Sequence, residues 1–327
     1  MKKSVAIVGA TGYTGAELIK ILINHPYFEI KTLFSSNGGE KIEEFYPAFK
    51  GVFEANIKKA EIDEIAKHDL VFLAVPHKTA MAFVKELYGK TKIVDFSADY
   101  RLNLENYENY YCPHIDIDNL KNGVYGLPEY FRDEIKKASL VANPGCYPTA
   151  TLLGLLPFVD LIEGNVFIDA KSGVSGAGKK LSETTHFVTI DENIFAYNPI
   201  HHRHSVEIKE KSGLDVNFVP HLIPVTRGML ISIYATLKDE NIDVKKILED
   251  RYKNEEFIRI KDKPVDIKST AGTNFCDIFV MQNGNSLFIN TSIDNLLRGA
   301  STQAVVNANI MMGYDENTAI PKIAYIP

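Results

Sequence analysis

Length, composition and charge exclude several classes of protein. A chain of 327 residues is longer than one hydrophobic core usually grows, so we expect two domains. The hydrophobic fraction of 45% and the charged fraction of 24% are those of an ordinary globular protein. Because the net charge is -6, the chain has no overall attraction for nucleic acid or an anionic membrane. An anionic substrate must therefore be bound by local cations.

The first half of the chain alternates short β-branched apolar runs with amphipathic stretches. This pattern is typical of an α/β domain of the Rossmann type, in which helices connect the strands of a parallel sheet. The predicted strands are residues 4–8, 29–34, 70–75, 92–96 and 140–142, and the predicted helices are 14–24 and 79–88.

After about residue 160 the apolar runs become longer and predict an α+β domain with a mixed or antiparallel sheet. The expected strands are 166–170, 217–220, 230–237 and 277–289. The last contains Asn283-Gly284, which predicts a hairpin with a type I′ turn. A helix with small residues along one face is predicted at 299–312, ended by Gly313, and we expect it to pack on the first domain.

A glycine-rich loop directly follows the first predicted strand. The segment from Gly9 to Gly15 is a G-x-x-G-x-x-G variant of the dinucleotide fingerprint. Its glycines let the backbone approach a pyrophosphate, which binds at the positive end of the next helix. An ordinary turn can also be rich in glycine, but the position between a strand and a helix favours a cofactor site. The predicted cofactor-binding residues are Gly9, Thr11, Gly12, Tyr13, Thr14 and Gly15.

The segment roughly 20 residues further on favours NADP over NAD. An NAD-preferring site carries Asp or Glu there, whereas this chain has Ser35 and Ser36 followed by Asn37-Gly38-Gly39. Neutral hydroxyls, with Lys41 close by, suit a 2′-phosphate. The segment lacks an arginine, which is the better phosphate ligand.

Cys146 is the candidate nucleophile. It lies between the predicted strand 140–142 and a helix expected at 150–158. A helix N-terminus lowers the pKa of a thiol and favours the nucleophilic thiolate. A buried structural cysteine is the alternative, but that description suits Cys276, in an alternating strand, better. Cys112 is expected to be an inert loop or packing residue.

The cysteines and the N-terminus also predict the compartment. An odd number of separated cysteines without C-x-x-C spacing argues against a disulfide framework or a structural zinc site. The apolar stretch before Gly9 is too short for a signal peptide, and the longest apolar run, 149–158, is too short to span a bilayer. We therefore expect a cytoplasmic protein without nucleic-acid or membrane partners.

A reactive thiol and a nicotinamide site together indicate one reaction. Free carboxylates resist hydride transfer, so cells first activate them as acyl phosphates, from which a thiolate displaces phosphate. The resulting thioester accepts hydride, and collapse of the thiohemiacetal releases an aldehyde. We predict reduction of a small acyl phosphate through a thioester on Cys146, a reaction that also needs a proton donor.

The proton donor is expected in the cluster His201-His202-Arg203-His204. Alternation along an extended segment would place His202 and His204 on one side and Arg203 on the other, without choosing between the histidines. A solvated loop is the alternative. No metal site is expected, because Arg203 would repel a divalent cation and no second ligand cluster is present. We interpret the pair as the acid/base candidates and Arg203 as an anion ligand.

Further candidate ligands are spread along the chain. Arg101, Arg227 and Asn143 could bind an anionic substrate, although a single arginine is more often a surface residue. A second glycine-rich loop, 172–178, contains Ser175 and Gly176 and could approach the cofactor, although a flexible turn explains it equally well.

These motifs closely resemble those of the N-acetyl-gamma-glutamyl-phosphate reductases, within the semialdehyde dehydrogenase group. The resemblance implies NADPH-dependent reduction of N-acetyl-L-glutamyl 5-phosphate to the 5-semialdehyde in arginine synthesis. It also implies that Cys146 is the nucleophile and a histidine of the His202/His204 pair the acid/base. The blocks that carry it run nearly from end to end: GATGYTGAEL, DFSADYRL, YGLPE, NPGCYPTA, SGVSGAG, HRHSVEI, PHLIPVTRG, GTN and DNLLRGASTQA.

The resemblance also implies where the cofactor and the partner subunit bind. Asn295 approaches the nicotinamide, with the loop 172–178 nearby, and the second domain's sheet forms the interface of a homodimer or homotetramer. We accordingly assign 1–147 and 299–327 to an NADP-binding domain and 148–298 to a catalytic and dimerisation domain. The chain departs from the family's usual pattern at Ser205-Val206, where Thr-Pro is common, and in lacking an arginine at 35–39.

Three other functions fit some of these features. A reductase of carrier-protein-linked aminoadipyl or glutamyl phosphate shares the chemistry. Such an enzyme would be expected to have a basic groove for its acidic carrier, which the net negative charge of this chain does not support. A nucleotide-sensing regulator would not need Cys146 and the histidine pair. A cysteine hydrolase would need no nicotinamide site.

Overall fold

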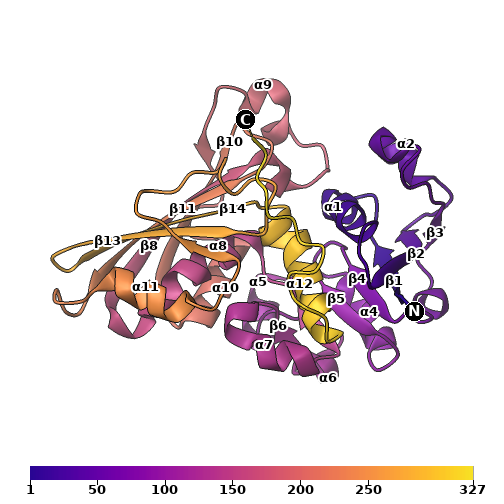
Figure 1. Cartoon of the computed structure of the whole chain (residues 1–327), viewed down its shortest axis with the longest axis horizontal. Helices are drawn as coiled ribbons and strands as arrows, with labels where there is room; N and C mark the ends of the chain where they lie inside the picture. The colour runs from indigo at the N-terminus through magenta and orange to yellow at the C-terminus, as the bar shows by residue number, and fades with distance from the viewer. Residues whose placement is uncertain (327) are drawn as a thin grey trace. The chain divides into compact units, whose positions relative to one another are not determined.

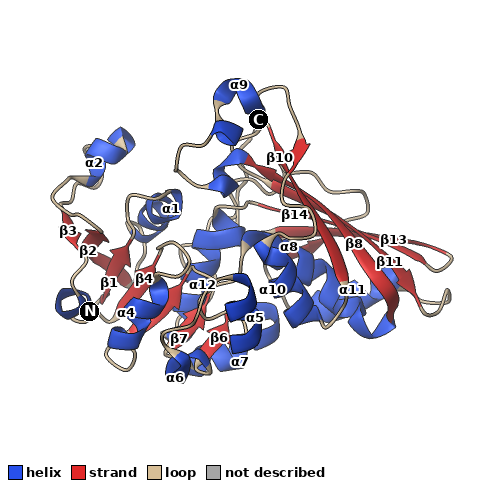
Figure 2. Cartoon of the chain, turned by 180° about the vertical axis from the view of Figure 1, so that it is seen from behind, coloured by secondary structure: helices blue, strands red, loops and turns tan. Residues whose placement is uncertain are grey.

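The structure is a computed structural model that describes residues 1–326, and these form two compact units (Figure 1). The first unit contains Met1–Gly145 and Ala300–Pro321, and the second contains Cys146–Gly299 and residues 322–326. The chain therefore passes from one unit to the other at three points. Each unit is built around its own seven-stranded sheet (Figure 2).

The sheet of the first unit is parallel throughout, with strand order β3-β2-β1-β4-β5-β7-β6, as predicted for a Rossmann-type domain. The order reverses between β1 and β4, so the carboxyl ends of these two strands form the switch point at which such sheets bind ligands. Its strands are β1 (Lys3–Val8), β2 (Phe28–Ser35), β3 (Ile57–Lys59), β4 (Leu70–Leu73), β5 (Lys92–Asp95), β6 (Gly123–Tyr125) and β7 (Leu140–Ala142).

The last long helix of the first unit, α12, is buried around its whole circumference, not along one small-residue face only. Its polar side chains bind the backbone: Gln303 and Asn307 both donate to the carbonyl of Gly126, at 2.7 and 2.9 Å. Gly313, with φ of 75°, follows its end as predicted. The helices of this unit are α1 (Tyr13–Leu22), α2 (Ile42–Phe45), α3 (Ile62–Ile65), α4 (Ala80–Leu87), α5 (Leu104–Tyr110), α6 (Ile117–Leu120), α7 (Pro128–Lys137) and α12 (Thr302–Met311).

The second unit has the predicted mixed sheet, in the order β12-β13-β14-β11-β8-β10-β9. The predicted hairpin joins β13 to β14, but the type I′ turn was wrong. Asn283 pairs with Ser286, so Gly284 and Asn285 form the turn, and of these only Gly284 takes a positive φ. The strands are β8 (Ile162–Gly173), β9 (Phe195–Ala196), β10 (Val216–Ile223), β11 (Met229–Leu237), β12 (Ile258–Ile260), β13 (Cys276–Asn283) and β14 (Ser286–Ile293).

Helices cover one face of this second sheet (Figure 2). The central one, α8, packs on β11 and β14 so closely that a side chain at Gly154 would meet Thr291 at 2.8 Å. On the opposite face Phe167, Tyr234 and Met281 are about half exposed. The helices are α8 (Cys146–Leu155), α9 (Phe187–Ile190), α10 (Arg203–Ser212) and α11 (Val244–Tyr252), and a π-helical turn spans Leu297–Ser301. In the part of the chain described, every helix is too short or too polar to span a bilayer.

Candidate active site

The glycine-rich loop of the first unit lies at the switch point and has the geometry of a pyrophosphate site. Gly9 has φ of 89°, and a Cβ there would lie 2.1 Å from the carbonyl oxygen of Ala74, so the close approach requires glycine. Gly12 precedes α1 without a side-chain cap, and the first turn has no acidic residue. The first N–H groups of α1 are therefore available to an anionic ligand.

At the end of β2, the Oγ of Ser35 accepts a hydrogen bond from the N–H of Gly38 at 2.9 Å. This contact shapes the turn and leaves Ser36 exposed. In the sheet, Ser35 is paired with Lys59, the last residue of β3. No motif in the sequence points to Lys59, because its strand is only three residues long and was not predicted.

Arg101 and Asn143 are buried in the first unit and bind its backbone. The guanidinium of Arg101 donates to the carbonyls of Asn143 and Phe96, at 2.7 and 2.6 Å. The amide of Asn143 donates to the carbonyl of Ala300 at 3.1 Å and accepts from Asn307 at 3.0 Å. These contacts fix the segment that leads to Cys146, and a role in substrate binding stays a prediction for both residues.

Cys146 is the first residue of α8, so the thiol lies at a helix N-terminus as predicted, although the helix begins four residues earlier than expected. Gly299, in the π-helical turn, lies against it. A Cβ at Gly299 would be 2.6 Å from the Cβ of Cys146 and 3.1 Å from its Cα. Only glycine fits beside the candidate nucleophile, and no signal in the sequence indicated this contact.

The histidine pair lies at the start of α10, and the predicted extended segment was wrong. The helix begins at Arg203, and His202 is its N-cap, with Nδ1 accepting the N–H of His204 at 3.1 Å. The two imidazole rings still come together, with centroids 4.9 Å apart. Burial, aided by the charge of Arg203, lowers the pKa of His202 to about 4. His202 is therefore neutral at pH 7.

Two tyrosines connect the histidines to the cysteine. The ring of Tyr147, the residue after Cys146, lies 5.7 Å from His202 and 5.8 Å from His204. Its hydroxyl is 3.1 Å from that of Tyr197. Burial raises the pKa of Tyr197 to about 12, with a smaller contribution from Cys146. No motif pointed to Tyr197, because it lies far from Cys146 in sequence.

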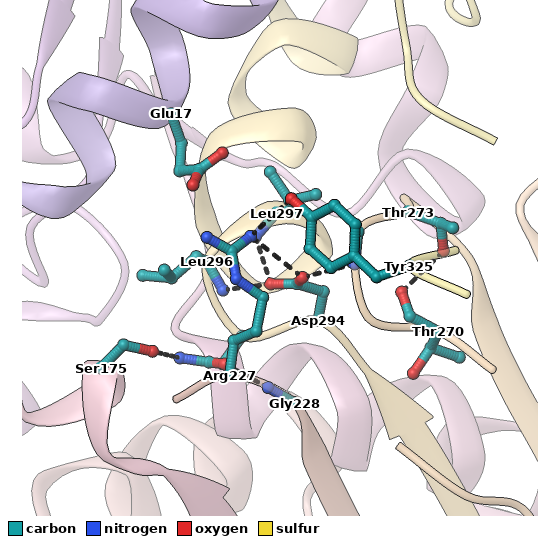
Figure 3. A network of polar contacts seen from close by, with 12 residues as sticks. Glu17, Ser175, Arg227, Gly228, Thr270, Thr273, Asp294, Leu296, Leu297 and Tyr325 are labelled. Atoms are coloured by element: carbon teal, nitrogen blue, oxygen red, sulfur yellow. Dashed lines mark hydrogen bonds and ion pairs between the residues drawn. The ribbon is translucent and has the colours of Figure 1, made fainter. Parts of the chain in front are cut away.

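Asn295 joins the predicted loop 172–178 to the segment between β10 and β11. Its side-chain oxygen accepts the N–H of Gly228 at 2.8 Å, and its amide donates to the Oγ of Ser175 at 3.0 Å (Figure 3). Gly176 lies next to Ser175, and a Cβ there would be 2.9 Å from the Oγ of Ser172. The loop 172–178 is thus held by Asn295, the residue that the family resemblance implies to lie near it.

Arg227 lies beside this network, with its side chain 18% exposed and Nη1 3.4 Å from the fully buried carboxylate of Asp294. Arg203 is exposed at the start of α10. In the second unit, Arg203 thus begins the helix that carries His204, and Arg227 contacts the residue before Asn295. Residues 1–326 contain no cluster of three His, Cys, Asp or Glu side chains that could hold a metal ion.

Two family models match the chain. The semialdehyde dehydrogenase NAD binding domain matches residues 4–138, and the semialdehyde dehydrogenase dimerisation domain matches residues 146–295. Among curated relatives, the N-acetyl-gamma-glutamyl-phosphate reductase of Sulfurimonas denitrificans is 57% identical, covering 99% of this chain and 98% of the relative. The enzyme of that name from Methanococcus maripaludis is 42% identical, covering 97% and 98%.

Solved structures share the fold at low sequence identity. Aspartate semialdehyde dehydrogenase II from Vibrio cholerae, complexed with ASA, has a TM-score of 0.72 and 17% identity, covering 96% of this chain and 99% of that one. Aspartate semialdehyde dehydrogenase with NADP from Candida albicans has a TM-score of 0.70 and 15% identity, covering 97% and 100%. Both similarities show a common fold.

Proposed function

Because the chain belongs to the N-acetyl-gamma-glutamyl-phosphate reductase family, oxidoreductases of the semialdehyde dehydrogenase group, we propose that it catalyses the reaction for which its relatives are named. That reaction reduces N-acetyl-L-glutamyl 5-phosphate to N-acetyl-L-glutamate 5-semialdehyde and phosphate, a step of arginine synthesis. The observation that supports it best is that Cys146 begins α8 and that the ring of the next residue, Tyr147, contacts both histidines.

In the proposed reaction Cys146 carries the acyl group. Its thiolate, favoured by the helix N-terminus, attacks the acyl carbon, so a C–S bond forms and the C–O bond to phosphate breaks. When bound, NADPH supplies the hydride that the thioester carbon accepts. The C–S bond then breaks, the aldehyde leaves, and the departing sulfur takes up a proton from a neighbouring acid.

We assign that proton transfer to His204. The Nδ1 of His202 is already used as the cap acceptor of α10, and the low pKa of His202 leaves it without the extra proton at pH 7. His204 lies within ring contact of both His202 and Tyr147. The structure thus favours His202 as the residue that orients the helix start and His204 as the acid/base.

The cofactor is proposed to be NADP. The uncapped N-terminus of α1 and the obligatory Gly9 fit its pyrophosphate, and the 2′-phosphate would lie near the exposed Ser36. The candidate cations are Lys59, which is paired with Ser35 in the sheet and forms an ion pair with Glu61, and Lys41, which follows the turn in the sequence. No carboxylate stands in the 35–39 turn to repel that phosphate.

The open face of the second sheet is the proposed interface of a homodimer. Phe167, Tyr234, Phe288 and Met281 occupy one register row across β8, β11, β14 and β13. Three of them are 49% to 55% exposed. Such an apolar row on an uncovered sheet face marks an interaction surface, and the dimerisation-domain match covers the same residues.

The reverse reaction tests the proposed function. With N-acetyl-L-glutamate 5-semialdehyde, phosphate and NADP, the purified protein is expected to form NADPH, and Cys146→Ser to abolish this activity because an alkoxide does not form at neutral pH. Cys112→Ser is the matched control and should retain activity. Activity that survives in Cys146→Ser would refute the mechanism. NAD, aspartate semialdehyde and a carrier-linked substrate in the same assay test the remaining alternatives.

A further inference from the structure

Tyr325, which no motif singled out, lies in the segment 322–326 and belongs to the second unit, although the chain just before it belongs to the first. Its N–H donates to the carbonyl of Ala271 at 2.9 Å. A Cβ at Gly272, where φ is 90°, would lie 3.1 Å from three atoms of the Tyr325 ring. The ring therefore lies directly on the backbone of a glycine. Lys322, at the start of the segment, forms an ion pair with Glu256.

The guanidinium of Arg227 lies against the same ring (Figure 3). Its Cζ is 5.4 Å from the ring centroid, within the range of a cation–π contact, and its Nη1 is 3.5 Å from the tyrosine hydroxyl. The same Nη1 is 3.4 Å from Oδ2 of Asp294. Two neighbours from distant parts of the sequence thus hold one edge of the guanidinium.

Asp294 connects this clamp to the candidate active site. Its Oδ2 also accepts the N–H of Gly272 at 2.7 Å, the glycine on which Tyr325 lies. Its Oδ1 accepts the N–H groups of Leu296 and Leu297, at 2.9 and 3.1 Å, where the π-helical turn begins. That turn contains Gly299, which lies against Cys146. The carboxylate that orients Arg227 therefore also fixes the turn beside the nucleophile.

We propose that Tyr325 is a positioning residue, which together with Asp294 holds the Arg227 guanidinium in the orientation that binds an anionic group of the substrate. This inference rests on the proposed function, since it takes Arg227 as the substrate's anion ligand. A guanidinium binds a carboxylate or phosphate through a planar fork, so its orientation decides whether two parallel hydrogen bonds can form. An arginine held in advance also loses less conformational freedom when the anion binds.

Two variants test the inference in the reverse assay. Tyr325→Leu keeps an apolar side chain on Gly272 but removes the ring and hydroxyl, and it should raise the KM for the semialdehyde or for phosphate roughly tenfold. Tyr325→Phe keeps the ring and should raise the same KM roughly threefold or less. In both, kcat should stay within about twofold of the wild type. The affected KM shows whether Arg227 binds the substrate carboxylate or the phosphate.

The control is Tyr314→Leu, which removes a tyrosine stacked on Tyr27 in the first unit and should leave both KM values unchanged. A fall in kcat with unchanged KM in both Tyr325 variants would overturn the inference, because loss of local structure would then explain it. Unchanged kinetics in both variants would overturn it equally.

A measurement without turnover separates this inference from the proposed function. Alkylation of Cys146 by iodoacetamide is followed while inorganic phosphate or N-acetyl-L-glutamate is titrated in as a protecting anion. Tyr325→Leu should need roughly tenfold more of one anion for half protection. If the wild type shows no reverse activity but this shift is found, the proposed reaction fails and the role of Tyr325 stands. Equal protection in wild type and variant refutes the role.

Discussion

The contact between Gly299 and Cys146 shows what a single residue contributes that no sequence pattern reveals. The sequence suggests that Gly299 starts a helix, and small residues follow it along one predicted face. In the structure it lies within a π-helical turn, a form often found at functional sites. A side chain there would overlap the nucleophile's own Cβ. Position 299 is thus restricted by a residue that lies far away in the sequence.

His202 and His204 are expected to differ in what their substitution costs. His204→Ala should lower kcat about 10²- to 10⁴-fold, because a general acid is lost. His202→Asn should keep most of the activity, because asparagine also accepts the N–H at a helix N-cap. Steady-state rates of the reverse reaction measure both.

His202→Ala provides the comparison, since it removes the cap and should lower the free energy of unfolding by about 1 kcal/mol. If His202→Asn were as inactive as His204→Ala, the two roles would have to be exchanged.

Short elements explain most of the differences between prediction and structure. β3 and β6 have three residues each, which is too few to show alternation. α10 has ten residues, but its buried Val206 and Ile208 are two apart, so helical periodicity is hidden there. Gly213 at its end, with φ of 71°, was the available signal, because a left-handed glycine commonly ends a helix.

The apolar row on the open face of the second sheet predicts that one substitution will weaken the oligomer. The wild type should be a homodimer, and Tyr234→Asp should shift it toward monomer, because a carboxylate in the centre of an apolar interface loses its hydration. Sedimentation velocity at several protein concentrations measures the mass.

Tyr110→Asp, at a comparably exposed tyrosine of the first unit, is the control and should leave the mass unchanged. A wild type that is monomeric, or a Tyr234→Asp variant with an unchanged mass, would contradict the proposed interface.

The stability of the whole molecule should depend on pH through His25. This buried side chain joins two distant parts of the first unit: Nδ1 accepts the N–H of Phe28 at 3.0 Å, and Nε2 lies 3.0 Å from Oδ1 of Asn309. Since Nδ1 is an acceptor, neutral His25 carries its proton on Nε2 and donates it to Asn309. Burial lowers its pKa from 6.5 to about 4.

The unfolded chain therefore binds a proton at His25 below pH 6.5, whereas the folded chain does so only near pH 4. The contribution to the free energy of unfolding is full above pH 6.5 and falls by up to about 3 kcal/mol as the pH drops to 4. Urea unfolding of wild type and His25→Gln across this range measures it, and the variant should lose stability less steeply. Burial raises the pKa of Asp95 to about 7, so its contribution to the free energy of unfolding changes with pH in the opposite direction. Only the difference in slope between wild type and His25→Gln therefore tests the role of His25. Equal slopes would contradict the assignment.

The general architecture could be predicted because apolar runs alternate with amphipathic stretches in the first unit and become longer in the second. The parallel sheet of the first unit, the mixed sheet of the second and the helix tip at Cys146 all follow from local runs of residues. The partners of Arg227 could not be predicted, because Asp294 and Tyr325 meet it only in the folded unit. For the same reason, Arg101 and Asn143 resemble surface ligands in the sequence but bind backbone carbonyls in the interior.

The route of the chain between the two units limits how the protein can be divided. α12 is synthesised after residues 146–299 of the second unit, yet all ten of its residues are buried within the first. A fragment that ends at Gly145 would leave the carbonyl of Gly126 without its two amide donors and would expose the apolar surface that α12 covers. To study the glycine-rich loop in isolation, residue 145 would have to be joined to residue 300 by a short linker. During synthesis, the first unit cannot complete its core until residues 146–311 have also left the ribosome.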